Sequence, residues 1–97
     1  ALDVAILSAD ALSAKHGALF HRAPEARLAQ VIANGAETAM LVLDHGKFGK
    51  TAPHRGPEPS TLDVLVSDQM PGKKLAKALE DWGIRAEIAV AQAGKEQ

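Results

Sequence analysis

The sequence contains no cysteine and no tyrosine, and its aromatic residues are limited to Phe20, Phe48 and Trp82. The absence of cysteine excludes disulfide bonds and thiolate metal sites, and small secreted domains more often carry disulfides. With so few aromatic residues, the core must be built from Leu, Val, Ile and Ala. We therefore expect a cytoplasmic domain with an aliphatic core.

The chain also lacks an excess of charge of either sign. It has 11 basic and 12 acidic residues, which give a formal net charge of −1. A nucleic-acid surface would leave a basic patch, so the balance argues against direct DNA contact by this chain. The apolar runs are far shorter than the roughly 20 residues of a membrane span, and no signal peptide is visible. The 97 residues suffice for one small domain, which we interpret as a piece of a longer protein.

Short apolar runs typical of buried strands recur along the chain. They are predicted at residues 4–7, 39–43, 62–66 and 84–90. Residues 50–61 contain three prolines, which exclude a central strand or a long helix and leave an ordered connector or a weak edge strand. Residues 13–22 are predicted to be a loop.

Two amphipathic helices are predicted between these runs. The first begins at Pro24 and stops at Asn34-Gly35, and the second follows Pro71-Gly72 and ends before Gly83. The apolar positions that share one helical face are Leu28, Val31 and Ile32 in the first helix, and Leu75, Ala78, Leu79 and Trp82 in the second. Strands that alternate with helices indicate βαβ units, and hence an α/β fold with a mostly parallel sheet.

The run from Leu41 to Gly49 is the most informative segment, because an apolar strand stops there at a carboxylate, a glycine and a lysine. Ligands of open parallel sheets bind just beyond the carboxyl ends of the strands. Lys47 is therefore a candidate for contact with phosphate or sugar oxygens, and Asp44 for accepting a sugar hydroxyl or orienting the lysine. The alternative is a partly exposed ion pair that contributes less than about 1 kcal/mol.

Four further polar residues lie near predicted strand ends or helix starts. Asp10 either faces the same crevice or caps its own loop. Asp68 is interpreted as the N-cap of the following helix. His45 is a candidate neighbour of the ligand, and Glu25 is a candidate lining residue whose place at a helix start already explains it.

The remaining histidines and a group of lysines are interpreted as solvated. No two histidines have the i, i+4 spacing of a helical zinc site, so no metal and no cofactor are predicted. Lys73, Lys74 and Lys77 form a basic cluster on the second helix, which we interpret as a solvated face.

Three collinear segments carry a family resemblance. Asp44-His45-Gly46-Lys47-Phe48-Gly49 is similar to an Asp-His/Ser-Ser-Lys-Phe-Gly signature, and Leu62 to Asp68 is similar to an Ile-Asp-x-Leu-Ile-Thr-Asp strand. His16-Gly17 and Glu25-Ala26 keep the family's spacing between a glycine and a Glu-Ala helix start. Over roughly residues 3–90, the chain thus resembles the C-terminal half of the effector-sensing domain of DeoR-type bacterial sugar-metabolism repressors.

The resemblance implies a Rossmann-like fold related to ribose-5-phosphate isomerase and the coenzyme A transferases. It also implies a non-enzymatic sensor of a phosphorylated sugar or polyol, and a homo-oligomer that contacts DNA only through an attached helix-turn-helix. The candidate ligand-binding residues are Lys47, Asp44, Asp10, His45 and Glu25. Residues 1–97 lack the family's helix-turn-helix and its Asp-Ser-Gly-Thr-Thr phosphate loop, so we expect the C-terminal part of a sensor domain.

The chain departs from the family pattern after the first strand. Where the family has Gly-x-x-Gly-Ile-Asp, this chain has Ser8-Ala9-Asp10-Ala11-Leu12-Ser13, whose side chains would narrow the approach of a ligand to the backbone. Two other functions therefore stay open. A sugar-phosphate isomerase needs a carboxylate base and would carry a second acid where Ser13 stands. A ligand-free oligomerisation module also stays open, because both family glycines are missing.

Overall fold

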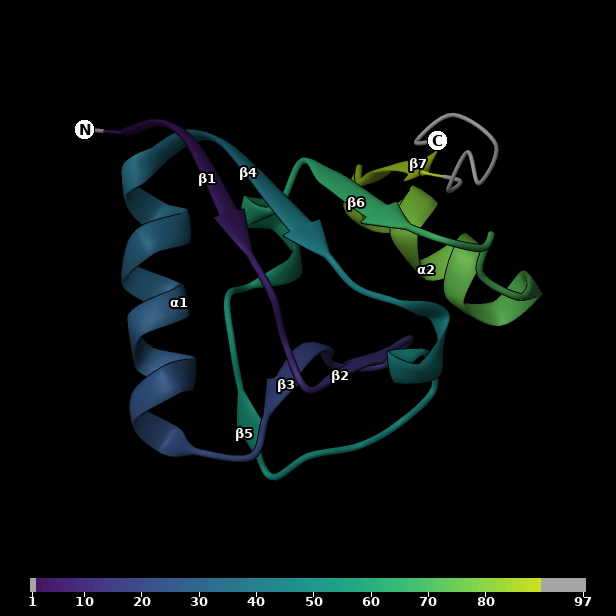
Figure 1. The fold of residues 1–97 in the computed structure, drawn as a ribbon, viewed down its shortest axis with the longest axis horizontal. Helices are drawn as coiled ribbons and strands as arrows, with labels where there is room; N and C mark the ends of the chain where they lie inside the picture. The colour runs from purple at the N-terminus through teal and green to yellow at the C-terminus, as the bar shows by residue number, and fades with distance from the viewer. Residues whose placement is uncertain (1, 90–97) are drawn as a thin grey trace, which may run out of the picture.

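Four parallel strands form the main sheet of the protein (Figure 1). In the computed structural model, which describes residues 2–89, they are β1 (Leu2–Leu7), β4 (Ala36–Val42), β6 (Val64–Ser67) and β7 (Arg85–Ile88). They lie in the order β1-β4-β6-β7 and every neighbouring pair is parallel. Each coincides with a predicted run, so the α/β, Rossmann-like fold is confirmed.

Two helices connect the strands of this sheet. Helix α1 (Ala23–Gly35) has its proline in the first turn, as predicted, and α2 (Lys73–Trp82) ends at Gly83. Gly83 adopts the left-handed conformation with φ of 78°, which glycine reaches without steric cost. No helix within residues 2–89 is long and apolar enough to cross a membrane.

Helix α1 faces the core with small residues. Its buried residues are Ala26, Ala29 and Ala33. By contrast, Leu28 and Val31 are 60% and 67% exposed, and Ile32 is half-buried. The expectation that the face shared by these three aliphatic residues marks the core side is therefore wrong. The alanines of α1 meet buried Ala39 of β4 in one cluster, and small side chains on both sides allow the helix and the sheet to approach closely.

A second, smaller sheet replaces the loop predicted at residues 13–22. Strands β2 (Ala11–Ser13), β3 (Gly17–Phe20) and β5 (His54–Arg55) are antiparallel and lie in the order β2-β3-β5. Gly17 enables the tight β2–β3 turn with φ of 79°. The two-residue β5 is an edge strand, which agrees with the weak edge strand predicted within residues 50–61.

The core lies between the main sheet, the helices and the small sheet. Leu41 and Leu65 of the main sheet, Leu75 and Leu79 of α2, and Leu12 of β2 belong to one buried cluster. Because the alanines of α1 belong to the same cluster, both helices pack on the same face of the main sheet. The small sheet lies beyond the carboxyl end of β1, on the side where the candidate ligand residues are found (Figure 1).

Candidate functional site

The loops that follow β1, β4 and β6 meet at one edge of the main sheet. After β4, the chain makes a single 3-10 turn, η1 (His45–Lys47). The backbone N–H of Gly49 donates to the Leu12 carbonyl at 2.9 Å, and the backbone N–H of His45 donates to Asp68 Oδ1 at 2.7 Å. The loop after β4 is therefore fixed on both sides at the edge where ligands bind in open α/β sheets.

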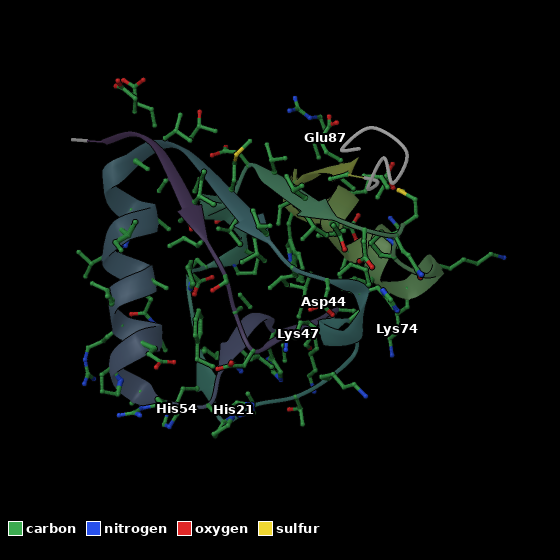
Figure 2. The ribbon with its side chains drawn as sticks, viewed as in Figure 1. His21, Asp44, Lys47, His54, Lys74 and Glu87 are labelled. Atoms are coloured by element: carbon green, nitrogen blue, oxygen red, sulfur yellow. The ribbon has the colours of Figure 1, made fainter. Side chains whose placement is uncertain are left out.

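Asp44 shapes the turn that presents Lys47. Its Oδ1 accepts a hydrogen bond from the Gly46 N–H at 2.7 Å and so caps η1. A Cβ at position 46 would lie 2.7 Å from that oxygen, so a larger residue there would require the Asp44 carboxylate to shift. Among residues 2–89 the ion pairs do not include Lys47, so the alternative of an Asp44–Lys47 pair is not formed. Figure 2 shows both residues at the η1 turn.

Asp68 binds His45 through both of its carboxylate oxygens. Besides the backbone contact to Oδ1, the ring Nδ1 of His45 lies 2.7 Å from Oδ2. Chiefly because of the hydrogen bond from the ring, the pKa of Asp68 is held below its ordinary value. The predicted N-cap role of Asp68 is wrong: α2 begins at Lys73 after Gly72, which makes no side-chain cap.

This contact determines the tautomer of His45. An ionised carboxylate accepts hydrogen bonds and donates none, so Nδ1 must carry the proton that points at Asp68. In the neutral ring, Nε2 is then left with its lone pair, and in the protonated ring Nε2 is a second donor. The ring is half-exposed, with 51% of the His45 side chain accessible. It therefore presents Nε2 beside the η1 turn in a fixed orientation.

The other two candidate residues lie apart from this turn. Asp10 Oδ2 accepts a hydrogen bond from the backbone N–H of His21 at 2.8 Å, which matches the loop-capping alternative and ties the end of β1 to the end of β3. Glu25 lies 3.9 Å from Arg22 and lines a separate apolar groove between β1 and α1. The structure thus gathers Asp44, His45 and Lys47 on one turn and places Glu25 elsewhere.

Asp68 belongs to the site, although the sequence led us to predict a role for it as a helix N-cap. The register pairs Val42 with Val66, so Asp44 and Asp68, each two residues further on, come after equivalent positions of adjacent strands. The sequence contained a signal for this, because each of the two apolar runs that form β4 and β6 is followed by an aspartate. Only the pairing of β4 with β6, however, shows that the carboxylate faces His45 rather than the helix that follows it.

The site consists of nitrogen and carboxylate groups without a metal cluster. Within residues 2–89, no group of three His, Asp or Glu side chains is placed to hold a metal ion. A family model described as DeoR C terminal sensor domain matches residues 1–69, a stretch that includes the η1 turn and Asp68. No curated protein matches the chain.

Proposed function

Because this chain belongs to the family of DeoR C-terminal sensor domains, we propose that it binds a phosphorylated sugar or polyol and thereby modulates DNA binding by an attached helix-turn-helix. Membership establishes the coarser statement, an effector-sensing domain of a regulatory family. The chemical class of the effector and the coupling to DNA are our proposal.

The observation that carries the proposal is the clustering of complementary groups on the η1 turn. Lys47 has no carboxylate within ion-pair distance among residues 2–89, and it supplies a point charge for phosphate or sugar oxygens. His45 presents Nε2, whose orientation Asp68 fixes. One oxygen of Asp44 holds the turn, and the other is available to accept a sugar hydroxyl. A phosphorylated polyol offers partners for all three groups.

The same hydrogen bonds suggest how binding is communicated. The η1 loop is bonded to the loop after β6 through Asp68 and to β2 through Gly49. A ligand bound to this loop therefore contacts a segment that is hydrogen-bonded to the chain after β6 and to β2, which follows β1. It shifts the balance between sensor states only by the difference between its affinities for those states. We propose that this difference biases the arrangement of the DNA-binding heads in a homo-oligomer.

Calorimetry on the full-length protein tests the site with a panel of sugar and polyol phosphates. Lys47→Ala should lower the affinity for whichever of these ligands binds by about tenfold or more, since it removes a charge-assisted contact. The matched control is Lys77→Ala, because Lys77 is exposed and paired with Asp81 on α2. Equal affinity of wild type and Lys47→Ala would contradict the site.

We propose a regulatory role rather than isomerisation because the two residues at the positions of an isomerase's acids are used to hold loops. Asp10 is bonded to His21, and Ser13, at the position of an isomerase's second acid, holds the β2–β3 turn with its hydroxyl. Turnover of an aldose phosphate by the full-length protein, followed by a coupled assay, would overturn this part of the proposal.

A further inference from the structure

A hollow of about 260 Å³ lies next to the η1 loop and is lined by three separate segments. Its lining residues are Ser13, Ala14 and Lys15 around the β2–β3 turn, Gly49, Lys50 and Thr51 after η1, and Lys74 of α2. We propose that this lysine hollow binds the phosphate group of a small phosphorylated metabolite. The inference goes beyond the proposed function because none of these residues belongs to the Asp44–Lys47 turn.

Among residues 2–89, the charges that line the hollow are of one sign and lack a paired counter-charge. No carboxylate lines it, and the ion pairs among residues 2–89 include none of Lys15, Lys50 and Lys74. The three exposed lysines bring like charges to one part of the surface, where they repel each other weakly through solvent. A bound phosphate offsets this repulsion. The volume is below the range of about 300 Å³ and more that larger ligands occupy, so the hollow suits a small anion.

The backbone holds two of these lysines in place. Ser13 Oγ accepts hydrogen bonds from the backbone N–H groups of Lys15 at 3.0 Å and His16 at 3.1 Å, which fixes the turn that carries Lys15. Lys50 follows Gly49, whose φ of 73° and hydrogen bond to Leu12 set the path of the loop. Because the segments are already ordered, an anion binds without first ordering the backbone.

Lys74 occupies an unfavourable place unless an anion is near. It is the second residue of α2, and cations at the N-terminal end of a helix oppose the helix dipole. The first turn of α2 contains no acidic residue that would compensate. Figure 2 places Lys74 in the same part of the molecule as Asp44 and Lys47. Lys74 is exposed, as the solvated-face interpretation predicts, but that interpretation gives no reason for a cation at this end of the helix, and such a cost is typical of functional positions.

Heteronuclear NMR on the full chain at low ionic strength tests the proposal, with inorganic phosphate and glycerol phosphate as probes. Both should shift the amide signals of Lys15, Lys50 and Lys74. Lys50→Gln and Lys74→Gln should each weaken binding by about fivefold, and the double variant further. Lys77→Gln makes the same change of charge on α2 outside the hollow and should leave the affinity within about twofold.

Four results would overturn the inference. They are absence of saturable shifts, equal weakening by Lys77→Gln, loss of the shifts in Lys47→Ala, and tighter binding of a random-sequence DNA duplex to the same residues. The third would mean that the lysine hollow and the η1 turn form one site. Persistence of the phosphate shifts in Lys47→Ala supports a separate site, even where calorimetry finds no sugar phosphate that depends on Lys47.

Discussion

The two faces of the main sheet have similar apolar residues but opposite surroundings. On the face that both helices cover, Leu41 and Leu65 are 3% and 1% exposed. On the other face, reached by alternate residues of the same strands, Ile6 is 69% exposed and Val42 is 41% exposed. Purely parallel sheets are normally buried on both faces and have aliphatic strands for that reason. Around Ile6 and Val42 the open face thus has the composition of a buried surface, although the described residues leave it exposed. Further along the same face, Val64 is buried, and β7 contributes Arg85 and Glu87.

The edge of the sheet beside β1 also has apolar residues that the described residues leave accessible. Within the part of the chain that the structure describes, β1 pairs only with β4 in the main sheet, and next to it lies a groove of about 240 Å³ whose lining includes Ile6, Leu28 and Ile32. An apolar edge of this kind is a template for further strand pairing. The difference between the two faces teaches that aliphatic composition alone does not identify the side on which this domain has its core. Substitutions on each face measure how far that difference persists in solution.

The largest expected effect is on the covered face. Leu65→Ala removes a side chain that is 1% exposed and belongs to the buried cluster that residues of both helices share. Truncation of such a leucine costs the transfer free energy and leaves a cavity, so we expect the free energy of unfolding to fall by about 3 kcal/mol. Urea denaturation monitored by circular dichroism measures this change. A loss below about 1 kcal/mol would show that the core collapses around the gap and would weaken the contrast between the faces.

An intermediate effect is expected from a residue that belongs to neither face. Asp63 Oδ2 accepts a hydrogen bond from the backbone N–H of Ala39 at 2.8 Å and so links the start of β6 to β4. Asp63→Ala leaves that partly buried N–H without its partner and should lower the free energy of unfolding by about 1–2 kcal/mol. Asp63→Asn keeps a carbonyl oxygen and should lose less. Equal losses in both variants would assign the effect to the charge rather than to the hydrogen bond.

A smaller effect, dependent on pH, should appear at the carboxyl edge. The pKa of Asp68 is lower in the folded protein than in the unfolded chain, chiefly because of the His45 ring, so the unfolded state binds more protons in the acidic range. The contribution of Asp68 to stability is therefore present above its unfolded pKa and is lost as the pH falls through its folded pKa. Thermal unfolding in an acidic pH series should show a shallower slope for Asp68→Asn than for wild type.

The same variant has a second readout, at the histidine ring. An amide at position 68 that donates to Nδ1 would move the proton of neutral His45 to Nε2, and ¹⁵N chemical shifts of the imidazole distinguish the two tautomers. Asp68 is half-exposed, so a structural role alone would leave stability almost unchanged. An unaltered tautomer together with an unaltered pH slope would contradict the positioning role of Asp68.

The sequence predicted the elements that have a clear apolar run or that begin or end at a proline or a glycine. The strands of the main sheet and the ends of both helices follow from apolar runs, Pro24 and Gly83. The β2–β3 hairpin was missed because its strands are three and four residues long, and β3 is buried on both sides and shows no alternation. The core-facing side of α1 was missed because two apolar stripes compete on that helix, and periodicity does not say which one meets the sheet.

The candidate site likewise has a part that the sequence predicted and a part that it did not. The position of Asp44 and Lys47 at a strand end could be predicted from the sequence, because the apolar run stops there. The pairing of Asp68 with His45 and the gathering of Lys15, Lys50 and Lys74 could not, because they depend on contacts between segments that are far apart along the chain. Local pattern indicates which residues follow a strand, whereas the register of the sheet decides which of them meet.

The smallest expected effect is on the open face, and it tests the comparison most directly. Ile6→Thr keeps a β-branched side chain on β1 and removes apolar surface that is already largely in contact with water. If the face is open in solution, the free energy of unfolding should change by less than about 0.5 kcal/mol. Urea denaturation of the full chain measures it beside Leu65→Ala. A loss of about 2 kcal/mol or more would mean that Ile6 is buried against protein in solution, and that both faces of this sheet are core.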